Sequence, residues 1–128
     1  MRIEVVGILD LECRSVEFRG PDGAAWGIWG ERDVPGSGFH DVEIDVPEEV
    51  EKWTLEEGAT TKIHGINTQC NGVTVVGRVE SVGEDAVIAI KVGLDIILIE
   101  MASNDSIPEA GSVISFNTPQ IYLHPYHL

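Results

Sequence analysis

The stretch DAVIAIKVGLDIILIEMA, residues Asp85 to Ala102, decides the fold class. Two runs rich in β-branched residues, Val87 to Ile90 and Ile96 to Ile99, flank a short turn at Gly93-Leu94, which is the pattern of a tight β-hairpin. Both runs are apolar at every position. Strands of that kind are usually covered on both faces, so we expect these two to lie at the centre of a sheet.

Further strands are predicted on both sides of this hairpin. The second half of the chain divides into five of them, separated by short turns: Val73–Val82, Asp85–Val92, Asp95–Ala102, Ser112–Phe116 and Gln120–His124. Five short strands with regular spacing and almost no helix are typical of a small barrel, and closure would remove exposed strand edges.

The first half also favours strands, because valine and isoleucine supply 29 residues of the chain and leucine and alanine only 14. Period-two alternation predicts strands at Ile3–Leu11, Arg14–Arg19, Ala24–Glu31 and Asp41–Val46. Pro47 could then occupy the first turn of one short helix over Glu48–Glu57.

These elements predict an all-β fold: a small OB-like barrel or a barrel-like sandwich with at most one short helix. A chain of 128 residues has the length of one domain. We expect a single domain over residues 1–128, with N-terminal strands in 1–71, an acidic segment in 41–57 and a five-stranded barrel-like part in 72–124.

The barrel-like part resembles a known family. Gly77-Arg78-Val79 opens a strand, the hairpin follows, Pro108 precedes Gly111-Ser112-Val113, and Ile121 to His124 closes the set. This order and spacing look like the OB-type barrels of TOBE domains. The resemblance implies a barrel that is an appendage of transport ATPases or a pocket for small oxyanions. No oxyanion-binding residue of that family carries over to this chain.

Charge excludes several functions. The chain has 22 acidic and 8 basic residues, for a net charge of -14, so it should be repelled by nucleic acids and by anionic membranes. The N-terminus lacks the pattern of a signal peptide, and we expect a cytoplasmic protein. Cys13 and Cys70 are then two free thiols, although one disulfide between them stays open.

The sequence carries no motif for catalysis. It has no Gly-x-Ser-x-Gly elbow, no phosphate-binding glycine loop and no dinucleotide fingerprint. His124 and His127 are close together, but no second pair of ligands at a zinc-site spacing accompanies them. We therefore predict a non-enzymatic protein with no catalytic residues, no metal and no cofactor.

The acidic segment 41–57 is the main candidate site. It holds eight acids and one base, half of the excess charge of the chain. One interpretation is a solvated face that keeps the protein soluble. The functional interpretation is a surface that binds a basic protein, with an aromatic anchor among the acids: Asp41, Glu43, Asp45, Glu48, Glu49, Glu51, Trp53, Glu56 and Glu57.

Function then divides into two classes. The first is a protein-binding module of the immunity or inhibitor type, which would cover a basic partner and attract it over long range. The second is a TOBE-like barrel that binds a small oxyanion. The negative charge of the chain opposes an anionic ligand and ranks this second class below the first.

Overall fold

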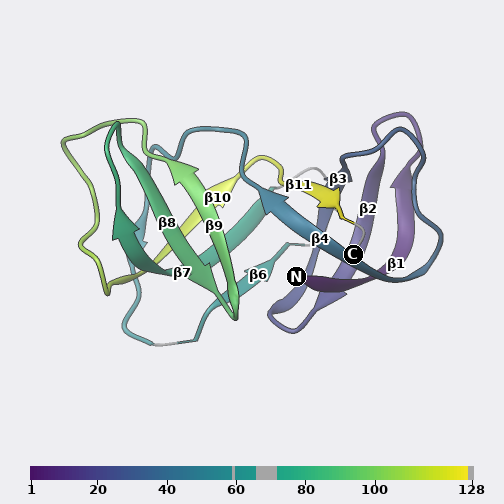
Figure 1. The fold of residues 1–128 in the computed structure, drawn as a ribbon, viewed down its shortest axis with the longest axis horizontal. Helices are drawn as coiled ribbons and strands as arrows, with labels where there is room; N and C mark the ends of the chain where they lie inside the picture. The colour runs from purple at the N-terminus through teal and green to yellow at the C-terminus, as the bar shows by residue number, and fades with distance from the viewer. Residues whose placement is uncertain (59, 66–71, 127–128) are drawn as a thin grey trace.

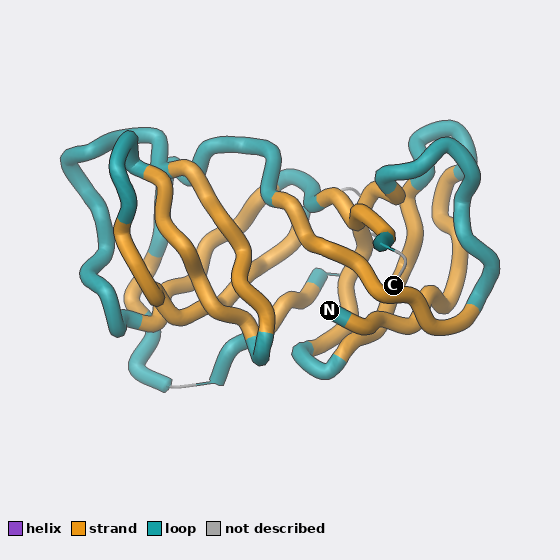
Figure 2. The backbone as a smooth tube through the Cα atoms, in the orientation of Figure 1, coloured by secondary structure: helices purple, strands orange, loops and turns teal. Residues whose placement is uncertain are grey.

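The computed structural model describes residues 1–58, 60–65 and 72–126. It confirms the all-β prediction, because the described residues form eleven strands and no helix. The strands make two bodies that lie side by side, a closed barrel and a second sheet (Figures 1 and 2). Among the described residues, no helix has the length and apolarity needed to cross a membrane.

The closed barrel contains five strands in the order β1-β2-β3-β11-β4. Four come from the N-terminal third of the chain, and the fifth comes from its far end and pairs in parallel with β3 and antiparallel with β4. Their bounds are β1 Arg2–Asp10, β2 Ser15–Gly20, β3 Gly23–Trp29, β4 Gly38–Asp45 and β11 Tyr122–Pro125.

The second sheet has six strands, with the order β5-β10-β7-β8-β9 and with β6 also paired to β7. Strands β6 and β8 share one edge of β7, since β6 pairs with Thr74–Val76 and β8 with Arg78–Val82. The bounds are β5 Thr54–Leu55, β6 Lys62–His64, β7 Val73–Val82, β8 Val87–Val92, β9 Asp95–Glu100 and β10 Val113–Thr118.

The barrel therefore differs in composition from the one expected over 72–124. All five strands predicted there exist, but β7 to β10 belong to the second sheet and only β11 belongs to the barrel. Local alternation and turn spacing locate strands, whereas the partner of a strand depends on long-range packing that leaves no local signal.

The helix predicted over Glu48–Glu57 is wrong. Val50 donates its N–H to the carbonyl of Glu100, and Glu56 donates to Val113, both at 2.8 Å. The segment thus hydrogen-bonds to both ends of the second sheet, beside β9 and beside β10. These sheet contacts satisfy its backbone, and Val46 is a poor residue to cap a helix.

The barrel and the sheet touch through β3 and β6. Ile63 donates its N–H to the carbonyl of Asp22 at 3.0 Å, and Gly65 donates to Ala24 at 3.1 Å. Gly23 has a φ of +133°, and a Cβ at this position would lie 2.5 Å from the carbonyl oxygen of Ile63. Only glycine fits there, so this turn sets how closely the two bodies approach.

Candidate interaction groove

A groove of about 610 Å³ lies between β4 of the barrel and β9 of the second sheet. It is called the β4–β9 groove here. Its lining mixes carboxylates, exposed aliphatic side chains and a histidine: Glu43, Asp45, Asp95, Ile96, Leu98 and His124. The two strands come from opposite halves of the chain, so only the folded protein brings these groups together.

The barrel wall of the groove comes from the alternation of β4. Val42 points into the core and is fully buried, while Glu43 and Asp45 point outward and are exposed. The neighbouring strand β11 places Nε2 of His124 3.9 Å from the Asp45 carboxylate. The His124 ring stacks on Tyr122, with ring centroids 5.9 Å apart.

The sheet wall is β9, and here the sequence prediction was wrong. We expected Ile96–Ile99 to be covered on both faces, but β9 is the end strand of its sheet. Ile97 and Ile99 are buried, whereas Ile96 is 54% exposed and Leu98 62%. An apolar run indicates double coverage only when a second layer packs on the outer face, and no described segment covers these two side chains.

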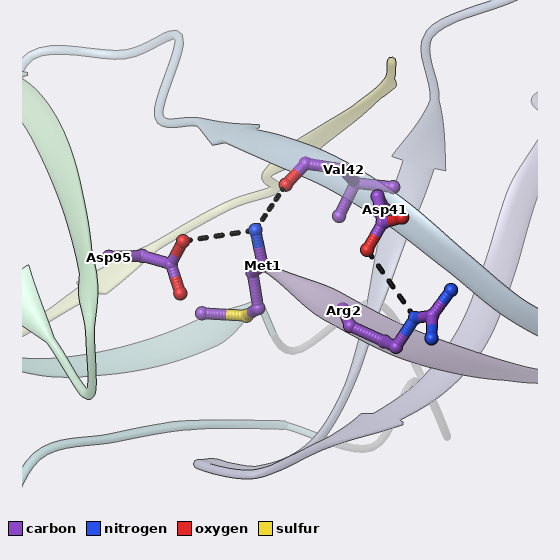
Figure 3. Close-up of polar contacts among 5 residues, drawn as sticks. All are labelled: Met1, Arg2, Asp41, Val42 and Asp95. Carbon is purple, nitrogen blue, oxygen red and sulfur yellow. Dashed lines mark hydrogen bonds and ion pairs between the residues drawn. The ribbon is translucent and has the colours of Figure 1, made fainter. Parts of the chain in front are cut away.

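Met1 is one of the residues that line the groove, and its N-terminal ammonium lies between Val42 of β4 and Asp95 of β9 (Figure 3). The Met1 nitrogen donates to the carbonyl of Val42 at 2.8 Å and lies 3.0 Å from Oδ1 of Asp95. Nearby, Nε of Arg2 is 3.4 Å from the Asp41 carboxylate. The contact between Met1 and Asp95 joins the barrel to the sheet. The ion pair between Arg2 and Asp41 lies within the barrel.

The carboxylate of Asp22 lies close enough to Asp95 to be repelled by it. The pKa of Asp22 is raised, first by burial and then by repulsion from Asp95. Its Oδ2 atom is buried and has no hydrogen-bond partner among the residues that the structure describes. Asp22 packs against Gly93, in the turn between β8 and β9. Negative charge is thus unfavourable at this point of contact between the two bodies.

The structure separates the candidate residues of segment 41–57 into three groups. Glu43 and Asp45 line the groove, and Asp41 pairs with Arg2. The exposed acids Glu48, Glu49 and Glu51 lie in the connection between β4 and β5. Glu56 and Glu57 line a separate shallow hollow beside β10, together with Arg78.

Trp53, expected to be an anchor for a partner, is half-buried and packs against the core. Its indole Nε1 donates to the carbonyl of Ser106 at 3.0 Å. The groove residues that the sequence analysis missed are Asp95, Ile96, Leu98 and His124. No local signal marked the exposed face of β9, because Ile96 to Ile99 is apolar at every position and shows no period-two alternation.

The described part of the chain includes only some of the residues considered for metal or thiol chemistry. It contains no group of three or more histidine, cysteine or acidic residues arranged to hold a metal ion. Cys13 is an exposed free thiol. Cys70 and His127 lie outside the described residues, so the expectations of two free thiols and of no metal at His124 and His127 stay predictions.

The fold and the groove define an all-β protein with a closed five-stranded barrel, the architecture expected of a small OB-like barrel. Comparison of the chain with models of protein families, with curated proteins and with solved structures gives no match.

Proposed function

We propose that this protein is a non-enzymatic binding module that holds a basic protein partner in the β4–β9 groove. One observation carries the proposal: the carboxylates of Glu43 and Asp45 share a groove with the exposed side chains of Ile96 and Leu98. Charged groups around an apolar centre are the usual composition of a protein interface.

The charge of the whole chain supports the same partner. With a net charge of -14, the protein attracts a basic surface over long range and increases the rate of encounter. Covering that surface would neutralise a basic toxin or enzyme, which is the action of immunity and inhibitor proteins. Association should therefore slow steeply as salt is added.

The test uses a partner captured from the native host and a matched pair of double variants. Glu43→Gln with Asp45→Asn removes two charges from the groove, and Glu56→Gln with Glu57→Gln removes two at the hollow beside β10. An exposed ion pair contributes about 0.2–1 kcal/mol, so the groove variant should weaken binding about 2- to 30-fold. Equal losses in both variants, or capture of neutral and acidic proteins only, would overturn the proposal.

The alternative function is oxyanion binding of the TOBE kind. The closed barrel is compatible with it, but the carboxylates in the groove repel an anion. A thermal-shift screen with phosphate, sulfate and molybdate separates the two functions. Bound oxyanion would raise the unfolding midpoint by mass action, and we expect no shift at millimolar concentrations.

A further inference from the structure

We propose that the partner contributes an extended strand, which pairs with the free edge of β9. This inference rests on the proposed function and adds the mode of recognition. A strand that joins an exposed sheet edge gains affinity from main-chain hydrogen bonds and specificity from the side chains beside it.

The first step concerns the direction of the backbone groups of β9. Strand β8 occupies one edge of β9, from the pair Val92 and Asp95 to the pair Val87 and Glu100. The carbonyl of Glu100 points to the other edge, because it accepts the N–H of Val50 at 2.8 Å. Backbone direction alternates along an antiparallel strand, so the N–H and C=O of Ile96 and Leu98 also point to that edge.

The second step concerns what occupies this edge. Val50 takes its far end, next to Glu100 and Met101. At the near end, the ammonium of Met1 contacts the side chain of Asp95. Between these two points, no described strand pairs with Ile96 or Leu98. Figure 1 shows this side of β9 facing the barrel. An unpaired stretch of backbone with exposed aliphatic side chains is a template for another strand.

The third step identifies the occupant by its chemistry. A strand along β9 would place apolar side chains beside Ile96 and Leu98, within a groove that also contains Glu43 and Asp45. It should therefore carry both apolar residues and lysine or arginine. A second copy of this chain is a poor occupant, because pairing would bring together two molecules of charge -14 and two copies of Asp95 and Glu100.

The experiment compares two synthetic peptides of equal charge, one with four Lys-Val repeats and one with four Lys-Pro repeats, both capped at their ends. In the register that places valine beside Ile96 and Leu98, the valine N–H groups face β9. The Lys-Pro peptide keeps the charge but lacks these donors, because proline has no N–H. We expect the Lys-Val peptide to bind about tenfold more tightly, the effect of roughly two main-chain hydrogen bonds. Amide exchange should slow at Ile96 and Leu98 when it binds.

Two variants at one position separate the backbone from the side chain. Ile96→Pro removes an outward N–H from β9, and Ile96→Ala keeps it while removing most of the side chain. The proline variant should lose the preference for Lys-Val over Lys-Pro, and the alanine variant should retain it. Circular dichroism of both variants checks the fold, and amide exchange of the wild-type protein gives a readout that needs no variant.

The outcomes distinguish the two proposals. Equal binding of both peptides, weakened by the Glu43→Gln and Asp45→Asn pair, would overturn strand pairing and leave the proposed function standing. Failure of both peptides to bind would count against both proposals. Self-association that protects the amides of Ile96 and Leu98 would overturn the basic strand as the occupant and assign the edge to a second copy.

Discussion

Replacing Gly23 with alanine should loosen the contact between the barrel and the second sheet. The new Cβ would lie 2.5 Å from the carbonyl oxygen of Ile63, a main-chain atom that cannot rotate away. The φ of +133° adds strain for any residue with a side chain. We expect a cost of about 1–3 kcal/mol for the backbone strain, and about 1 kcal/mol more for hydrogen bonds displaced around β6.

The free energy of unfolding should therefore fall by about 2–4 kcal/mol, measured by urea titration, and the thermal midpoint by about 10 °C. Gly7→Ala is the matched control, because no atom lies within 4 Å of a Cβ built there. That change should be neutral or slightly stabilising, since alanine restricts the unfolded chain. A Gly23→Ala protein within about 0.5 kcal/mol of wild type would refute the close approach of β3 and β6.

Three further predictions concern single side chains. Burial and the charge of Asp95 raise the pKa of Asp22, so the folded state holds that proton more tightly than the unfolded state does. The free energy of unfolding should therefore fall as pH rises from about 4 through the raised pKa, and Asp22→Asn should remove this fall in pH-dependent unfolding curves. Trp53→Phe deletes the indole hydrogen bond and should cost about 1 kcal/mol in urea titrations. Leu98→Lys should change the free energy of unfolding by under about 0.5 kcal/mol because that side chain is exposed, whereas Ile99→Ala should lower it by about 2–5 kcal/mol because Ile99 is buried. Equal losses of stability in the two variants, measured by calorimetry, would contradict the assigned faces of β9.

The sequence predicted strands well where one face is in water. The acids and aliphatics of segment 41–46 alternate, and β4 runs from Gly38 to Asp45 with Val42 buried and Glu43 exposed. The strand predicted over Val73–Val82 has the bounds of β7. Period-two alternation is a local property of the chain, so it predicts a strand regardless of which other strand it pairs with.

The failures all depended on distant partners. Segment 48–57 contains good helix formers, but its backbone bonds go to Glu100 and Val113. The all-apolar run of β9 suggested that both faces of this strand are buried, but the side chains of Ile96 and Leu98 on its outer face are exposed. Half of the groove was predictable from Glu43 and Asp45. The other half required knowing that β9 packs near β4, which no local pattern encodes.

The place of β11 in the barrel has a consequence for how the chain folds. Strands β1 to β4 are complete by Asp45, yet the gap between β3 and β4 is filled by Tyr122–Pro125. During synthesis the N-terminal strands therefore wait, with unpaired edges, until more than half of the chain has followed them. Closing so long a loop is slow, and the barrel can be completed only after β11 has been synthesised. A chaperone that shields the edges of β3 and β4 during this interval would raise the yield of native protein.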